Sequence, residues 1–530
     1  MTTFRLLFLP ITCLALLLGR TAVFAAPPHG EKPDAKAEDH KSDDKKADNK
    51  DKNDDLKDSS SVTHHTAKIG DQEIKYTATA GKLVMKDDEG KPKAQVFYVA
   101  YTRDGVDELG KRPVTFAFNG GPGSSSVWLH LGMLGPQRVK VPDDASQQPP
   151  PFKLEANPHS LLDITDLVFI DPVSTGFSRP AKGENDDQFH GYQEDLASVG
   201  QFIHDYVTKN GRWLSPKFLI GESYGGLRAA GLTGHLRDRY NMTLNGVLMI
   251  SPAINFETIG FAFGNDLPYI LFVPGYTAAA WYHKALPGDL QALSLAEVVK
   301  QATEFALGEY ALAMMKGHTL GDDERAAVAE KLARYTGLSK EFVLQSKLRI
   351  GMSRFSKELL RDRSRVVGRY DSRFQGIDAD DAGDNPEDDA SASAVFGPFT
   401  AAINDYLHTD LKVDDEHVYE VLTDKVQPWS YGRYSAHYPD ATNTLRQSMS
   451  ANPYLKLFVA SGYYDLATPP ATVKYSIDHL RLPPELQKNI DHKFYEGGHM
   501  MYIHEPSMKQ LRKDVEAFYE RALEPTESDK

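Results

Sequence analysis

The chain has 530 residues, 41% of them hydrophobic, so it is long enough to bury a large core. Its formal net charge of -14 leaves little basic surface to neutralise phosphates, which argues against a nucleic-acid partner.

The first residues, 1–25, are predicted to be a secretory signal peptide. Arg5 precedes an apolar stretch, Leu6 to Leu18, and small residues favour cleavage after Ala25. A membrane anchor is the alternative, but the stretch is short for a spanning helix. The single cysteine, Cys13, lies inside this segment, so the mature protein is predicted to have no disulfide. We expect a secreted or periplasmic protein without an integral membrane segment.

Residues 26–62 are rich in Lys, Asp and Glu and poor in apolar residues, which predicts a disordered linker. Beyond it, alternating apolar residues over 74–78 and 94–101 predict antiparallel strands. Later apolar runs predict further strands, and helical spacing of Leu196, Val199, Ile203 and Tyr206 predicts a helix between them. This alternation indicates an α/β fold with a mostly parallel sheet. The further strands are expected at residues 114–118, 167–170, 218–220, 247–250, 455–460 and 493–495.

The middle of the chain, residues 256–435, is predicted to be a helical cap inserted between two parts of the core, 63–255 and 436–524. A short tail, 525–530, would follow. The acidic stretch 378–389 is expected to be a solvated loop and not a metal site, because its carboxylates follow no recognised ligand spacing. Helices are expected within the cap at 297–316, 322–335 and 354–361.

The segment 217–226 carries the strongest functional signal. A short apolar strand runs into Gly-Glu-Ser-Tyr-Gly, and a helix-compatible segment follows. Small residues on both sides of Ser223 permit the sharp turn that exposes a serine hydroxyl at a helix N-terminus. An ordinary glycine-rich turn is the alternative. The flanking strand and helix favour a nucleophile elbow, with Ser223 as the nucleophile.

A serine nucleophile needs a base, and the base needs a third group that fixes its tautomer. In such a fold the acid and then the histidine follow the serine along the chain. Asp465 comes just after the strand predicted at 455–460, and His499 lies in a Gly-Gly-His-Met turn after the strand at 493–495. We therefore predict Asp465 and His499 as the partners of Ser223.

A glycine-rich loop, Asn119 to Ser126, directly follows the strand predicted at 114–118. Such a loop can aim a backbone N–H at an oxyanion, and the N–H of Tyr224 would supply the second donor. A phosphate-binding loop is the alternative, but the Gly-Lys-Ser/Thr ending of such loops is absent.

Together these motifs resemble the serine carboxypeptidase family (peptidase family S10), here as a secreted bacterial member. The resemblance covers most of residues 64–523 outside the cap and implies an α/β-hydrolase fold. The matching segments, in family order, are Asn119–Ser126, Leu134-Gly135-Pro136, Asn157-Pro158-His159-Ser160, Phe169-Ile170-Asp171-Pro172, Gly176-Phe177-Ser178, Gly221–Gly225, Ser461–Asp465 and Gly498-His499-Met500.

The resemblance also implies functional roles for residues around the elbow. Gly121 and Tyr224 would line the oxyanion hole, and Asn119 and Glu222 would bind the free C-terminal carboxylate of a peptide. Glu222 must carry a proton to share a hydrogen bond with that carboxylate, so an acidic pH preference is expected. No metal or organic cofactor is expected.

Three positions depart from the family pattern, one of which is Ser124 in place of a usual Cys. Ala117 replaces a usual Trp, and Met133 replaces the Glu that usually precedes Leu-Gly-Pro. Arg228, one helical turn after Ser223, is either a replacement cation for the carboxylate or an ordinary helix residue. The leading interpretation is an exported serine carboxypeptidase. A serine esterase or acyltransferase with the same triad is the first alternative, and a catalytically silent binding protein the second.

Overall fold

The computed structural model describes residues 56–524. The predicted signal peptide with its cleavage site, most of the predicted linker and the predicted tail lie outside these residues. The last part of the predicted linker is within them and is partly in a strand, because β1 begins at Ser59.

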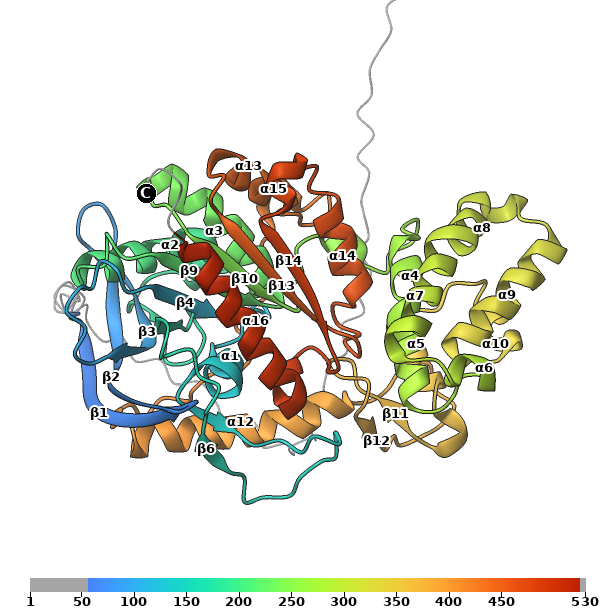
Figure 1. Cartoon of the computed structure of the whole chain (residues 1–530), viewed down its shortest axis with the longest axis horizontal. Coiled ribbons are helices and arrows are strands. Elements are labelled where there is room, and N and C mark those ends of the chain that lie inside the picture. The colour runs from blue at the N-terminus through green and yellow to red at the C-terminus, as the bar shows by residue number, and fades with distance from the viewer. Residues whose placement is uncertain (1–55, 525–530) are drawn as a thin grey trace, which may run out of the picture. The chain divides into compact units, whose positions relative to one another are not determined.

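A ten-stranded sheet runs through the centre of the described region (Figure 1), in the order β1-β2-β3-β7-β4-β9-β10-β13-β14, with β8 paired to β3. In this order, neighbouring strands are antiparallel from β1 through β2 and β3 to β7. From β7 through β4, β9, β10 and β13 to β14 they are parallel. This arrangement confirms the predicted α/β fold. The strands are β1 (Ser59–Ile69), β2 (Gln72–Lys86), β3 (Pro92–Arg103), β4 (Val114–Phe118), β7 (Asp166–Ile170), β8 (Arg179–Pro180), β9 (Lys217–Glu222), β10 (Gly246–Ile250), β13 (Lys456–Gly462) and β14 (Ile490–Tyr495).

Both faces of the sheet are apolar, as parallel strands buried between helices require. Along β4, for example, Phe116 and Phe118 pack into the cluster on one face, and Ala117 packs into the cluster on the other. One face is covered by α2 (Tyr192–Lys209), α3 (Tyr224–Tyr240), α13 (Thr442–Ala451), α14 (Pro470–Asp478) and α15 (Pro484–Gln487). The other is covered by α1 (Val127–Leu129), α12 (Ala390–Thr409) and α16 (Glu505–Leu523).

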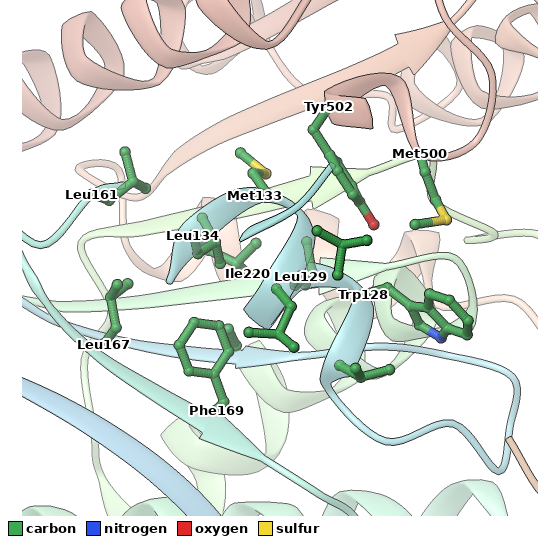
Figure 2. Packing of buried hydrophobic residues seen from close by; sticks show 14 of the residues in the cluster. Trp128, Leu129, Met133, Leu134, Leu161, Leu167, Phe169, Ile220, Met500 and Tyr502 are labelled. Carbon is green, nitrogen blue, oxygen red and sulfur yellow. The ribbon is translucent and has the colours of Figure 1, made fainter. Parts of the chain in front are cut away.

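Figure 2 shows the packing of buried hydrophobic residues on this second face. Trp128 and Met133 come from the segment after β4, and Met500 and Tyr502 come from the segment after β14. All four side chains are buried. The core therefore joins two segments that are more than 360 residues apart and that both border the predicted site.

A separate set of helices follows β10 and has its own apolar cluster, in which Tyr276 stacks on Phe355 with ring centroids 4.0 Å apart. Figure 1 shows these helices gathered to one side of the sheet. They are α4 (Leu267–Leu271), α5 (Val273–Tyr282), α6 (Gly288–Gln291), α7 (Leu295–Phe305), α8 (Ala311–Lys316), α9 (Asp322–Thr336), α10 (Lys340–Gln345) and α11 (Met352–Glu358).

The range predicted as a cap also contains α12, which packs in the sheet's own core. Val395, Phe399 and Ile403 recur at helical spacing and are buried in the cluster beneath the sheet. Two short hairpins complete the fold: β5 (Gln137–Val139) pairs with β6 (Leu154–Ala156), and β11 (Val366–Val367) pairs with β12 (Gln375–Gly376). No helix within residues 56–524 has the length and apolar character needed to cross a membrane.

Candidate active site

Ser223 occupies a sharp turn between β9 and α3. Its φ of 62° lies in the left-handed region, which a non-glycine residue adopts only when its surroundings enforce it. Hydrogen bonds hold the turn, from Ser223 N to the Ile250 carbonyl at 3.1 Å and from Ala253 N to the Ser223 carbonyl at 3.0 Å. Gly221 has no room for a side chain, because a Cβ there would lie 2.1 Å from the Gly225 carbonyl oxygen. The glycines of the motif thus make the strained turn possible.

Asp465 and His499 meet at the carboxyl ends of β13 and β14. The Asp465 Oδ2 atom lies 2.8 Å from His499 Nδ1, and both side chains are buried. The other oxygen, Oδ1, accepts backbone N–H bonds from Ala467 at 2.7 Å and Thr468 at 2.9 Å. Since a carboxylate only accepts hydrogen bonds, His499 donates from Nδ1 and leaves Nε2 as an acceptor.

The environment of His499 favours its protonated form. Burial alone lowers the pKa of the imidazole, but the charge and hydrogen bond of Asp465 outweigh burial and raise the pKa above its usual value. The Nε2 atom is buried and has no hydrogen-bond partner among the described residues. His499 and Ser223 line the same cavity, so Nε2 is open to a proton-donating group there.

The glycine-rich loop after β4 lies directly against the elbow. A Cβ on Gly120 would lie 2.5 Å from Tyr224 N, so only glycine permits this approach. Gly121 has a φ of 101°, a conformation that favours glycine. The Ser126 N–H donates to Asp171 Oδ1 at 2.8 Å and anchors the end of the loop. The structure thus brings the two predicted oxyanion residues, Gly121 and Tyr224, to adjoining segments.

Asn119 and Glu222 both line the cavity and both are buried. Burial raises the pKa of the Glu222 carboxyl to about 7, although His499 and a hydrogen bond from Tyr502 favour the charged form. That bond runs from the Tyr502 hydroxyl to Glu222 Oε2 at 2.7 Å. Asn119 Oδ1 accepts from Leu129 N at 3.1 Å, whereas Nδ2 is buried without a partner among residues 56–524.

These groups surround one cavity of about 120 Å³. Buried polar atoms in native proteins nearly always have partners, so each exception points to a bound molecule or solvent. Here two such atoms, Asn119 Nδ2 and His499 Nε2, belong to residues of the same wall. The lining residues are Asn119, Gly120, Gly121, Ser124, Trp128, Glu222, Ser223, Arg369, Tyr370, Val395, Phe396, Leu422, His499 and Met500.

Arg228 does not line this cavity. Its Nε donates to Asp195 Oδ2 at 2.7 Å, its Nη1 donates to the Asn119 carbonyl, and its guanidinium lies over the rings of Phe118 and Tyr224. The side chain is 1% exposed. The suggested role as a replacement cation for a bound carboxylate is therefore wrong. Arg228 instead fixes the backbone of the loop that carries Asn119.

Of the three residues that depart from the family pattern, Ser124 lines the cavity, whereas Ala117 and Met133 lie outside its wall. Ala117 is buried in β4, and Met133 is buried in a helical turn over 130–134. Asn157 holds this turn through bonds from Nδ2 to the carbonyls of Met133 at 2.9 Å and Gly135 at 2.8 Å. The motif around Asn157 therefore stabilises the turn over 130–134, which follows the cavity residue Trp128.

Sequence reasoning missed several residues that line or adjoin the cavity. Arg369 and Tyr370 come from the β11–β12 connection, Phe396 comes from α12, and Leu422 comes from the loop after α12. Tyr502 lies behind Glu222. All except Tyr502 belong to the range predicted as a cap, where no motif marks them, so only the tertiary packing of α12 and the hairpin reveals them.

Comparison with known proteins identifies the family to which the chain belongs. The family model for serine carboxypeptidases matches residues 71–511. A pheromone-processing carboxypeptidase kex1 from Sclerotinia sclerotiorum is 34% identical over 136 residues, which is 24% of this chain and 19% of the relative. Serine carboxypeptidase-like 36 from Arabidopsis thaliana is 28% identical over 174 residues, 32% of this chain and 33% of the relative. The matched segments thus span between a fifth and a third of these relatives.

A solved structure shares the fold. The prohormone-processing carboxypeptidase Kex1ΔP from Saccharomyces cerevisiae superposes with a TM-score of 0.52 at 16% identity, covering 84% of this chain and 91% of that one. The family model covers most of the chain and includes every residue of the cavity wall. The chain therefore belongs to the serine carboxypeptidase family and has the α/β-hydrolase fold.

Proposed function

We propose that this protein is an exported serine carboxypeptidase that removes C-terminal residues from peptides through an acyl-enzyme intermediate. The observation that carries the proposal is the shared cavity in which Ser223, His499 and the pair Asn119 and Glu222 meet. A nucleophile and base alone would support any acyl transfer. The adjoining pair, a protonatable buried carboxyl and an unpartnered amide, adds a place for a substrate carboxylate.

In the proposed reaction Ser223 Oγ attacks the last peptide carbonyl while His499 Nε2 takes the hydroxyl proton. The N–H groups of Gly121 and Tyr224 stabilise the oxyanion that forms. The C–N bond then breaks, His499 returns the proton to the leaving amine, and the peptide remains as an ester of Ser223. Water, deprotonated by His499, hydrolyses the ester and restores the serine. Asp465 orients the imidazole and stabilises its charged form throughout.

The C-terminal carboxylate of the substrate is proposed to bind between Asn119 Nδ2 and the protonated Glu222 carboxyl. Two carboxyl groups can share a proton only while one of them is protonated. Because the pKa of Glu222 is about 7, this recognition is available below neutral pH and is lost above it. The raised pKa of His499 limits the rate on the acid side, because a protonated imidazole cannot act as a base. We therefore expect a bell-shaped profile whose acid limit is set by His499 and whose alkaline limit is set by Glu222.

Export is proposed from residues 1–25, whose sequence has the pattern of a secretory signal. N-terminal sequencing of protein recovered from a host's culture medium or periplasm tests this. A new N-terminus at Ala26 supports the proposal, and retention of Met1 on a cytoplasmic protein contradicts it.

The enzyme class is tested by labelling with a fluorophosphonate, which reacts with activated serines. We expect Ser223 to be labelled in the wild type and labelling to be lost in Ser223→Ala and strongly reduced in His499→Ala. An unlabelled wild type would favour a silent binding protein. Labelling together with turnover of simple esters but not of peptides would favour the esterase or acyltransferase. In that case Ser223→Ala should abolish the ester turnover.

A further inference from the structure

The cavity wall contains one lysine or arginine among the described residues, and this is Arg369. It lies in the connection between β11 and β12, on the cavity wall with Ser223 and His499. Its side chain is exposed, unlike those of Asn119 and Glu222. Arg369 therefore places a positive charge at the open side of the cavity.

The backbone that carries Arg369 is fixed on three sides. The Arg369 N–H donates to Asp389 Oδ1 at 3.0 Å, and its carbonyl accepts from Leu466 N at 3.0 Å. The next carbonyl, of Tyr370, accepts from His499 N. Because Leu466 follows Asp465 directly, these bonds tie the Arg369 segment to both the acid and the histidine loops. The base of the side chain thus has a defined position relative to the proposed reacting atoms.

The guanidinium itself has no such tie. It lies over the Tyr370 ring, 5.2 Å from the centroid, and it forms no ion pair or side-chain hydrogen bond within residues 56–524. Other arginines near the surface are paired, as Arg349 is with Asp266 at 2.6 Å and Arg334 is with Asp289 at 2.6 Å. An unpaired guanidinium on a cavity wall can receive the carboxylate of a ligand in bidentate geometry.

We propose that Arg369 makes this protein select peptides whose C-terminal residue has an acidic side chain. The inference rests on the proposed carboxypeptidase function. If Asn119 and Glu222 hold the terminal carboxylate, the side chain of that same residue occupies the cavity that Arg369 borders. Among residues 56–524, the single acidic side chain on the wall is that of Glu222, which is neutral at acidic pH and so does not repel a second carboxylate.

The rest of the wall explains why Arg369 decides the preference. Trp128, Val395, Phe396 and Met500 offer apolar surface to any side chain, whether acidic, amide or aliphatic. These residues therefore contribute a similar affinity for every side chain, and the charge of Arg369 makes the affinity for Glu higher than that for its neutral analogue Gln. For an exposed guanidinium we expect a preference of roughly two- to fivefold, which a buried pair would exceed.

The test compares matched peptides that differ only in the last residue, Glu, Gln, Leu or Lys, near pH 5.5. The side chain of Glu is ionised at that pH, with an ordinary pKa of about 4.3. The wild type should have a higher kcat/KM for Glu than for Gln, and the lowest for Lys. Arg369→Gln should bring the Glu to Gln ratio near one. Arg369→Glu should reverse the order and favour Lys.

Arg365→Gln is the matched control, because Arg365 lies in the same segment but does not line the cavity. It should keep the wild-type ratio. Raising the salt concentration should reduce the Glu preference of the wild type and leave Arg369→Gln unaffected. A wild-type ratio near one, or a ratio that survives in Arg369→Gln, would overturn the inference.

Failure of the proposed carboxypeptidase function can be distinguished from failure of the proposed role of Arg369. If none of the peptides is cleaved, the same peptides are tested for protection of Ser223 against fluorophosphonate labelling. Better protection by the Glu peptide than by the Gln peptide, lost in Arg369→Gln, would still support the acidic selectivity of the cavity. Equal protection by both peptides would contradict it. Cleavage of the Leu peptide without discrimination between Glu and Gln would retain the carboxypeptidase and reject the role of Arg369.

Discussion

The Tyr502 hydroxyl donates a hydrogen bond to Glu222 Oε2 at 2.7 Å, and this bond joins the histidine loop to the nucleophile elbow. Both side chains are buried, and Glu222 also lines the cavity. A donor favours the charged carboxylate, whereas burial favours the neutral acid. These opposing effects set the pKa of Glu222 to about 7, so the carboxyl changes from protonated to charged near neutral pH.

Replacing Tyr502 with Phe should move the alkaline limit of peptide cleavage upward. Loss of the donor removes a hydrogen bond that stabilises the charged carboxylate, so the pKa of Glu222 rises further. Such bonds to charged groups contribute about 1.5–3 kcal/mol, which corresponds to roughly one to two pH units. The measurement is KM against pH for a free-acid peptide. Tyr495→Phe, which removes a hydroxyl bonded to Asp514 at 2.8 Å, is the control and should leave the limit unchanged. A downward shift in Tyr502→Phe would contradict the account.

Glu222→Gln should stabilise the protein at alkaline pH. The pKa of Glu222 is raised from 4.5 to about 7 in the folded state, so the folded protein holds this proton more tightly than the unfolded chain. Its contribution to stability is present below pH 4.5 and declines as pH rises through 7, by about 3 kcal/mol. Gln titrates nowhere in this range. Urea unfolding at pH 5 and pH 8 should therefore show the variant gaining on the wild type at the higher pH.

The control for that experiment is Glu505→Gln, whose difference from the wild type should stay nearly constant between pH 5 and pH 8. Burial opposes ionisation of Glu505, but hydrogen bonds from His159 and Arg138 lower its pKa to about 2. The charged form thus stabilises the folded state above the ordinary carboxyl pKa, and the Gln variant lacks it. Parallel pH dependence in the two variants would contradict both assignments.

Arg228→Met should destabilise the protein by about 3–5 kcal/mol, because it leaves Asp195 charged and buried without its partner. The double variant Arg228→Met with Asp195→Asn should recover much of this stability. It should not recover activity, since the Asn119 carbonyl would still lack the Arg228 donor that holds its loop. Denaturant unfolding and kcat/KM separate the two effects. Full activity in a stable double variant would show that the loop needs no such anchor.

The glycines of the elbow should differ in their tolerance of alanine. A Cβ on Gly221 would lie 2.1 Å from the Gly225 carbonyl oxygen, a backbone clash that nothing can relieve without opening the turn. A Cβ on Gly225 would come no closer than 3.0 Å to the Phe118 oxygen. We expect Gly221→Ala to cost about 3 kcal/mol and most fluorophosphonate labelling, and Gly225→Ala about 1 kcal/mol. Equal effects would show that the turn relaxes around either methyl group.

The sheet and the elbow were predictable because they depend on local sequence. The strand predicted at 114–118 has the bounds of β4, since a fully apolar run followed by glycine has few other solutions. Ser223 is flanked by glycines for a steric reason visible in the sequence. Asp465 and His499 follow strands in chain order, and this order is enough to nominate them even before their 2.8 Å contact is known.

The residues that complete the cavity were not predictable in this way. The apolar spacing along α12 indicates a helix but not the surface on which it packs. The range predicted as a cap therefore included a helix that packs against the sheet. Arg228 has the spacing of a residue that could face the site, and only its contacts with Asp195 and Asn119 reveal the opposite orientation. Contacts across hundreds of residues, like that of Tyr502 with Glu222, have no local signal.

The most direct test of the account is hydrolysis of one peptide made with a free and with an amidated C-terminus, followed by mass spectrometry near pH 5.5. The wild type should remove the last residue of the free acid and act at least tenfold more slowly on the amide, given a charged hydrogen bond of about 1.5–3 kcal/mol. Ser223→Ala should cleave neither. Equal cleavage of both forms would contradict carboxylate recognition by Asn119 and Glu222, and cleavage by Ser223→Ala would contradict the proposed nucleophile.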